Sequence, residues 1–213
     1  INSLLWFNGH WTDFLDLNLD IYQAISKSKR SLLMLHACID LACVYYWLGE
    51  FENSEKYAQK ALTIAKLIKN SSFTAQAQDR LGKIYQLKNN LDESIKNLKT
   101  ALNYFKRTDD FEKIGNVLRH IGEGYMMLGK FKKAEKYLNF AIDQYLKIDN
   151  SSIRLMYHAL INSHLGIAIY KQKKYKEAEK LFISSLDFEE KAGGRAGTKI
   201  GSKLGLGLLY EER

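Results

Sequence analysis

The sequence contains no proline and only two cysteines, Cys38 and Cys43, among its 213 residues. Without proline, long uninterrupted helices are free to form, whereas proline-rich linkers and most all-β folds are disfavoured. Two cysteines cannot build a disulfide framework, and five positions apart on a helix they point about 140° away from each other. We therefore expect neither a mutual disulfide nor a shared metal, and we expect a reducing, cytoplasmic compartment.

The chain also lacks a signal peptide and a targeting motif. It begins at Ile1 and ends at Arg213 inside a helical pattern, so we expect it to be part of a longer protein. One apolar stretch, residues 31–49, has Asp40 as its only charge. A charge at the centre of a membrane span is costly, so we interpret this stretch as a buried helix and expect no membrane partner.

A set of residue types recurs every forty residues. Leu41, Leu81 and Ile121 mark the frame, and each is followed by alanine or glycine. The other columns hold a tyrosine (Tyr45, Tyr85, Tyr125), a large apolar residue (Phe51, Leu91, Phe131) and an alanine (Ala61, Ala101, Ala141). Self-similarity at this period is typical of stacked helix pairs, which commonly bind other molecules.

Residues 75–107 show the expected helix pair most clearly. Apolar residues recur at helical spacing over 75–87 and over 91–107, and the polar residues 88–90 interrupt the pattern. We predict two antiparallel helices joined by a short turn. The glycine column (Gly82, Gly122, Gly166, Gly205) costs about 1 kcal/mol of helix propensity per position, so we predict close approach of the paired helices there.

The frame divides the chain into segments of one continuous solenoid. Residues 1–34 hold a partial first repeat, with Ile1 and Leu5 in the tail of its first helix; repeats follow at 35–74, 75–114, 115–158 and 159–197, and a truncated last repeat occupies 198–213. Leu165-Gly166 lies 44 residues after Ile121-Gly122. We expect the four extra residues around 149–152, where they would lengthen the preceding helix or its loop.

Residues 121–141 carry a pattern that resembles the tetratricopeptide repeat: Ile121, Gly122, Tyr125, Gly129, Phe131, Ala134, Leu138 and Ala141. The usual repeat has 34 residues and a proline, whereas these repeats have about 40 and none. The longer form is similar to repeats of kinesin light chains, spindle-orientation adaptors, bacterial peptide-sensing regulators and the sensor arrays of bacterial signalling ATPases. Gly9-His10-Trp11 is similar to a motif near the start of those sensor arrays, or is another intra-repeat turn.

The resemblance implies an all-α, right-handed superhelical solenoid whose first helices line a concave groove. Carried onto this sequence, the groove positions lie around the leucine of each frame. They are Ile39, Asp40 and Cys43, then Asp79, Arg80 and Lys83, then Arg119, His120 and Glu123, and finally Ser163, His164 and Ile167. The carboxylate clamp of chaperone-binding members does not match these positions, so a chaperone co-factor role is disfavoured.

Two arrangements of these residues stay open. His120 and His164 occupy one column and form either a metal or pH-sensing pair or polar groove lining. The charges of Asp79, Arg80, Lys83, Arg119 and Glu123 form either inter-repeat salt bridges or a set of contacts for a polar ligand.

No catalytic constellation is visible. The segment 193–199 lacks the Gly-Lys-Ser/Thr order of a phosphate loop and follows a helical pattern, so we interpret it as an inter-repeat loop. No serine or cysteine has a base at suitable spacing. We expect no enzyme activity, no cofactor and no metal.

The net charge of +8 is concentrated in two lysine clusters at intra-repeat turns. They are Lys130, Lys132, Lys133 and Lys136, and Lys171, Lys173, Lys174 and Lys176. We interpret them as solvated surface, with a nucleic-acid or acidic-membrane footprint as the less favoured alternative. The sequence therefore predicts a scaffold that binds a peptide or protein segment. The alternatives are a sensor or autoinhibitory domain of a bacterial signalling ATPase or transcriptional regulator and, less favoured, a nucleic-acid-binding solenoid.

Overall fold

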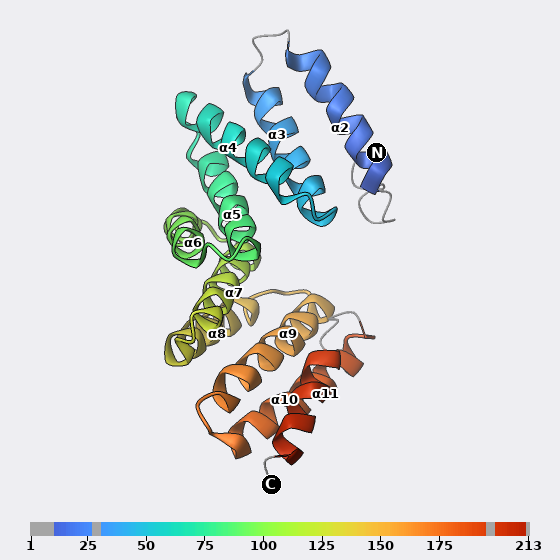
Figure 1. Cartoon of the computed structure of the whole chain (residues 1–213), viewed down its shortest axis with the longest axis vertical. Helices are drawn as coiled ribbons and strands as arrows, with labels where there is room; N and C mark the ends of the chain where they lie inside the picture. The colour runs from blue at the N-terminus through green and yellow to red at the C-terminus, as the bar shows by residue number, and fades with distance from the viewer. Residues whose placement is uncertain (1–10, 27–30, 195–198, 212–213) are drawn as a thin grey trace. The chain divides into compact units, whose positions relative to one another are not determined.

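The computed structural model describes residues 11–26, 31–194 and 199–211, and every element within these ranges is an α-helix (Figure 1). The helices are α2 (Trp11–Ser26), α3 (Ser31–Trp47), α4 (Phe51–Leu67), α5 (Ser71–Leu87), α6 (Leu91–Phe105), α7 (Phe111–Met127), α8 (Phe131–Tyr145), α9 (Ser151–Tyr170), α10 (Tyr175–Lys191) and α11 (Lys199–Glu211). The predictions for Ile1, Leu5, Gly9-His10 and residues 195–198 lie outside the described residues. The helices form two compact units, Ile1–Tyr104 and Phe105–Arg213. The all-α prediction is confirmed.

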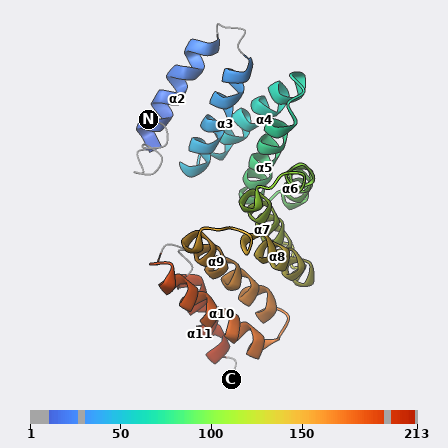
Figure 2. The same ribbon diagram turned by 180° about the vertical axis from the view of Figure 1, so that it is seen from behind.

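The helix pairs α3–α4, α5–α6 and α7–α8 are closed by the same kind of turn. The backbone enters the left-handed region at Gly49, Asn89 and Gly129, with φ of 78°, 58° and 69°. The N–H of the next residue then donates to the carbonyl of the tyrosine of the frame, over 2.9, 2.8 and 2.8 Å. This is a Schellman ending, and it leaves three residues between the helices. The second helix therefore returns alongside the first, as the reverse view also shows (Figure 2).

The glycine column lies where paired helices are closest. A Cβ on Gly82 would stand 2.5 Å from Cγ of Leu98, and a Cβ on Gly122 would stand 2.8 Å from Cγ of Leu138. Gly166 meets the ring of Phe182 in the same way. A methyl group at any of these positions would collide with the second helix of its own pair, so the predicted close approach is confirmed.

First and second helices begin differently. Asn70, Asp110 and Asn150 precede α5, α7 and α9, and their side chains accept a hydrogen bond from the N–H three residues on. Glu50, Lys130 and Lys174 precede α4, α8 and α10 and provide no such bond. The inter-repeat loops thus fix the start of each first helix through a side-chain N-cap, whereas the intra-repeat turns fix the second helix through backbone bonds.

The four extra residues lie in a different place from the one predicted. The first helices α3, α5, α7 and α9 begin forty residues apart, four to eight residues before the predicted repeat boundaries. The loop before α9 has the same length as the loop before α7, but α9 has 20 residues and α7 has 17. Three of the four residues therefore lengthen the following helix, and the fourth lies in the α9–α10 turn, which has four residues where the α7–α8 turn has three. The preceding helix and its loop are not lengthened. Arg154 supports the added turn by donating from Nη1 to the carbonyl of Ile148 over 3.0 Å.

The apolar stretch at residues 31–49 forms α3, in which Leu35, Cys38 and Leu41 are fully buried. Leu35 and Cys38 pack with alanines of α4 and with Leu81 and Ile84 of α5 into a core of unit 1. In the described part of the chain, no helix combines the length and the apolar character needed to span a bilayer.

Candidate functional site

In unit 1, predicted groove residues of α3 and α5 lie near one another. Burial raises the pKa of the Asp40 carboxyl, although His36 and the Arg80 guanidinium act in the opposite direction. Burial likewise raises the pKa of the Cys43 thiol, against the effect of Arg80. A carboxyl, a thiol and a guanidinium from two successive first helices therefore share one half-buried surface.

Four of the predicted charges form two ion pairs, each within a single helix. Lys83 Nζ lies 2.7 Å from Oδ2 of Asp79, one turn earlier on α5. Arg119 Nη1 contacts Oε1 of Glu123 in the same relation on α7. These pairs brace single helices and are not the inter-repeat salt bridges that the sequence left open. Arg80 is half-buried and forms no ion pair with any described residue.

In unit 2, Glu123 is the centre of a charged cluster that joins α7 to α9. His120 Nδ1 lies 3.0 Å from Oε2 of Glu123, and His120 Nε2 lies 2.7 Å from Nη2 of Arg119. Because an arginine can only donate, Nε2 of His120 must accept and Nδ1 must carry the proton. His164 Nδ1 of α9 lies 3.2 Å from Oε1 of Glu123, without the alignment of a hydrogen bond.

The electrostatics of this cluster favour an ionised Glu123 and a neutral His164. Burial alone would raise the pKa of the Glu123 carboxyl, but His120 and Arg119 outweigh it and hold that pKa far below its usual range. Burial lowers the pKa of His164, although the Glu123 charge partly offsets the effect. The two histidines therefore meet across one carboxylate, and a pH-sensitive contact is chemically available.

A row of hydrogen bonds extends from this cluster through α8. The Tyr145 hydroxyl donates to Oδ1 of Asn116 over 3.1 Å, and Nδ2 of Asn116 donates to the Tyr157 hydroxyl over 3.2 Å. Tyr157 in turn donates to Oε1 of Glu112 over 2.7 Å. The two tyrosine rings stack with centroids 4.0 Å apart. Burial and the bond to Glu112 raise the pKa of Tyr157 to about 12, so the row stays uncharged at its tyrosines.

Sequence reasoning did not find Asn116, Tyr145 or Tyr157. A signal was present, because Tyr145 stands twenty-four residues after Ile121, in a column that holds Ala65 and Phe105 in the preceding repeats. Gly115 is the matching change on α7, and a Cβ there would lie 2.5 Å from Cε1 of Tyr145. The glycine makes room for the tyrosine hydroxyl to reach α7.

Three predicted site residues take part in helix packing instead of an open surface. Ser163 is buried, and its Oγ lies 3.3 Å from the place where a Cβ of Gly201 on α11 would stand. Ile167 packs against the core around Phe182, and Ile39 packs against the core of unit 1. Each lies on the first helix as predicted, but neighbouring helices cover much of its side chain.

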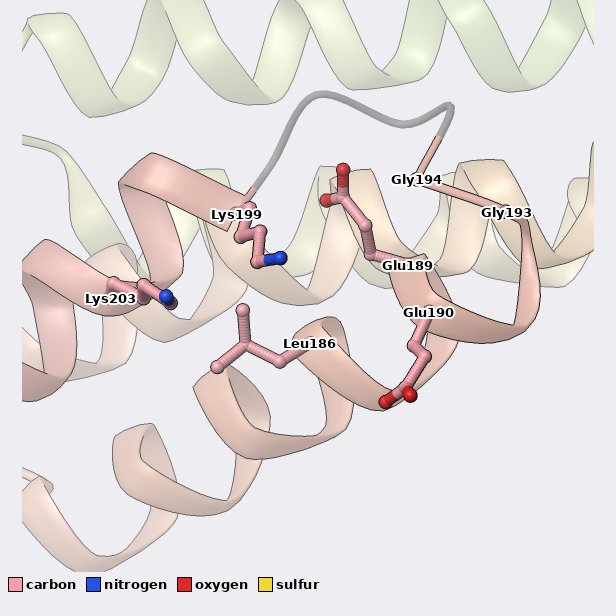
Figure 3. A pocket seen from close by; sticks show the side chains of 7 residues that line it. All are labelled: Leu186, Glu189, Glu190, Gly193, Gly194, Lys199 and Lys203. Atoms are coloured by element: carbon pink, nitrogen blue, oxygen red, sulfur yellow. The ribbon is translucent and has the colours of Figure 1, made fainter.

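A separate hollow of about 460 Å³ lies between α10 and α11 in unit 2. Its charged lining comes from Glu189 and Glu190 of α10 and from Lys199 and Lys203 of α11, and Figure 3 shows Leu186 between them in this view. None of the predicted groove residues lines this hollow. Among the described residues, no group of three or more His, Cys, Asp or Glu side chains could hold a metal ion.

Antiparallel helix pairs at a forty-residue period, with charged first helices, define a helical repeat array. Residues 33–107 match the family model described as tetratricopeptide repeat. A curated relative, tetratricopeptide repeat protein 29 of Trypanosoma brucei brucei, is 24% identical over 140 residues. Those residues are 66% of this chain and 28% of the relative, so the chain matches little more than a quarter of that protein.

Solved structures share the fold over most of the chain. The apo form of RapI has a TM-score of 0.80 at 18% identity. The alignment covers 99% of this chain and 78% of RapI. A putative kinesin light chain of Podosopora anserina with nearly identical TPR-like repeats has a TM-score of 0.69 at 17% identity. The alignment covers 89% of this chain and 92% of the kinesin light chain structure.

Two further structures are sensors. NprR in complex with its cognate peptide NprX has a TM-score of 0.70 at 18% identity and covers 88% of this chain and 54% of NprR. A signal transduction ATPase with a tetratricopeptide repeat sensor from Pyrococcus horikoshii has a TM-score of 0.75 at 18% identity. The alignment covers 88% of this chain and 29% of the ATPase. Residues 33–107 thus match the tetratricopeptide repeat model, and the described helices share the helical solenoid fold of these structures.

Proposed function

We propose that the chain is a protein-interaction scaffold that binds an extended peptide or partner segment along the surface formed by its first helices. The observation that carries this proposal is the grouping of charged and polar side chains at matching positions of successive first helices. Asp40 and Cys43 lie near Arg80 in unit 1, and Glu123 lies near His164 in unit 2.

The chemistry of this surface suits a peptide of mixed charge. Its side chains are half-buried, so their polar ends are held by neighbouring helices before a ligand arrives. A preformed surface avoids most of the ordering cost of binding, and charged groups offer charge-assisted hydrogen bonds to a peptide backbone or side chain. The peptide bound in NprR supports the same use of this fold.

Arg80 is the most informative position to test. Arg119 and Lys83 are held in ion pairs on their own helices, and their removal would take a cation away from a half-buried carboxylate. Arg80→Ala removes a cation without breaking an ion pair, and Asp40→Asn changes the opposing charge. Lys66→Ala, on the exposed surface of α4, is the matched control.

Peptide display against the chain should enrich sequences that bind the wild type. We expect Arg80→Ala and Asp40→Asn to weaken the best peptide about tenfold, as one lost charge-assisted contact does. Lys66→Ala should leave the affinity unchanged, as measured by fluorescence anisotropy. Equal affinity for all variants would place the binding surface elsewhere.

A second candidate function is a sensor domain within a larger signalling protein. It is favoured by the likeness to the ATPase sensor, of which this chain covers 29%. In that case the first-helix surface would hold another segment of the same protein until a ligand released it. A nucleotide-binding or DNA-binding domain encoded beside these residues would support this function, and a gene encoding the array alone would exclude it.

A further inference from the structure

The two lysine clusters of the sequence come together on one edge of unit 2. The α7–α8 turn and the α9–α10 turn are linked by Gln172, whose Nε2 donates to Oε2 of Glu135 over 2.8 Å. Lys174 Nζ also lies 3.9 Å from that oxygen. We call residues 128–136 and 170–180 together the lysine edge. It holds nine lysines against three glutamates, a net charge of +6, and so accounts for most of the +8 of the chain.

Most of this charge is available to a partner. Lys130, Lys132, Lys173 and Lys176 are exposed, and among the described residues none of them forms an ion pair. Glu135 lies near Lys174 and offsets only part of the charge, so the edge keeps its net positive charge. The turn also holds a hollow of about 380 Å³ lined by Gly129, Lys130, Phe131, Lys132, Lys133 and Gln172. The edge thus includes a shallow, open depression at the α7–α8 turn.

We propose that the lysine edge is a second interaction surface, separate from the first-helix surface, and that its partner is an acidic protein segment rich in aspartate and glutamate. Lysine recognises anions as a point charge without fixed geometry, which suits flexible carboxylates. An extended acidic chain can lie in the depression and meet lysines from both turns. The binding energy comes from many exposed pairs, and it is therefore sensitive to salt.

Two features favour a polypeptide over a nucleic acid. The edge contains no arginine, the residue that reads bases and grips phosphate in a bidentate manner. Two of its three aromatic rings are in contact within the protein: Tyr175 packs on Tyr170 with centroids 5.6 Å apart, and Lys171 lies over Tyr170. The third, Phe131, is a single ring in the depression and offers no second ring for a neighbouring base. A stacking platform for unpaired bases is therefore absent from the described part of the edge.

The test uses poly-L-glutamate as the probe and the chain as it stands. Lys130→Gln, Lys132→Gln, Lys173→Gln and Lys176→Gln are combined in one edge variant. The matched control combines Lys56→Gln, Lys66→Gln, Lys69→Gln and Lys106→Gln, which remove the same charge from exposed positions elsewhere. Circular dichroism melts establish that both variants fold.

We expect poly-L-glutamate to bind the wild type at low ionic strength. The edge variant should bind it at least about tenfold more weakly, because four exposed charge pairs together account for that much. The control variant should bind nearly as the wild type does. Absence of binding, or equal losses in both variants, would overturn the proposal. Tighter binding of a single-stranded oligonucleotide or of phosphatidylserine vesicles at the same edge would also overturn it, because the partner class would then be different.

Discussion

Gly115 and Tyr145 show how one side chain alters the role of a repeat. The tyrosine reaches across the helix pair only because its neighbour on α7 has no Cβ. Its hydroxyl then begins the row of bonds that ends at Glu112 on the same helix by way of Tyr157 on α9. The contact between α7, α8 and α9 is thus polar at a point where the preceding repeats carry apolar side chains.

Replacement of this glycine should be costly, whereas the same change at an open position should not. Gly115→Ala is expected to destabilise the protein by about 1–3 kcal/mol, because the methyl group overlaps the Tyr145 ring. Gly207→Ala on α11 meets nothing within 4 Å and should stabilise by about 0.5–1 kcal/mol through helix propensity. Urea unfolding of both variants checks the pair. Effects of the same sign would contradict the packing described for Gly115.

The Glu123 cluster predicts a loss of stability in acid. The pKa of His164 in the folded protein lies below its usual 6.5. The stability that the neutral imidazole contributes is therefore present above pH 6.5 and is lost as the pH falls from there towards the folded-state pKa. Glu123 has a pKa below its usual 4.5, so its contribution is lost at still lower pH. Burial also lowers the pKa of His158, so this histidine adds to the loss of stability in acid.

The free energy of unfolding should therefore fall as the pH is lowered from about 7.5 to about 5.5, by at most about 1.4 kcal/mol per pH unit for each proton taken up, and the melting temperature should fall with it. His164→Gln should reduce this dependence, because it removes one of the protons involved. An unchanged pH dependence in the variant would show that His164 keeps an ordinary pKa in the folded protein.

At the scale of the helix, the two kinds of helix start differ in what holds them. Asp110 accepts from the N–H of Lys113 over 3.0 Å and from its Nζ over 2.6 Å. Asp110→Ala is therefore expected to cost about 1 kcal/mol, as for other side-chain N-caps. Lys130→Ala, at the start of α8, removes no cap and should be nearly neutral. Thermal melts that rank the two variants in the opposite order would refute this distinction.

The helices and their packing could be predicted from the sequence, but the position of the four extra residues in the fourth complete repeat could not. The turns at 88–90 and the close helix packing followed from residue spacing, because the apolar stripe and the glycine column are local patterns. The place of the four extra residues could not be read in this way. A longer α9 keeps the same forty-residue interval between helix starts and shifts only the leucine of the frame. The start of α9 is fixed by the Asn150 cap, whose partner is a backbone N–H.

The proximity of some candidate site residues was predictable, but their contacts were not. The frame put His120 and His164 in one column, and the structure brings both to Glu123. The sequence frame could not reveal that Arg119 and Lys83 form ion pairs within their own helices, since the preferred partner depends on side-chain geometry. Nor could it reveal the burial of Ser163, which depends on the packing of α11 against α9.

At the scale of the whole chain, two surfaces of different chemistry are proposed for partners. The first-helix surface combines both signs of charge with half-buried side chains, whereas the lysine edge is cationic and exposed. Binding at the lysine edge should weaken steeply with added salt, because exposed charges are screened over about 10 Å at ordinary ionic strength. Binding at the first-helix surface should depend less on salt, since its groups are partly shielded from solvent.

The central claim, that the first helices bind a peptide, is tested most directly by a double-mutant cycle. The affinity of the best selected peptide is measured for wild type and Arg80→Ala, each with and without alanine at every acidic position of the peptide. A coupling energy of at least about 1 kcal/mol between Arg80 and one acidic residue is the predicted result. Couplings near zero at every position would contradict the account, because the peptide would then bind away from the first-helix surface.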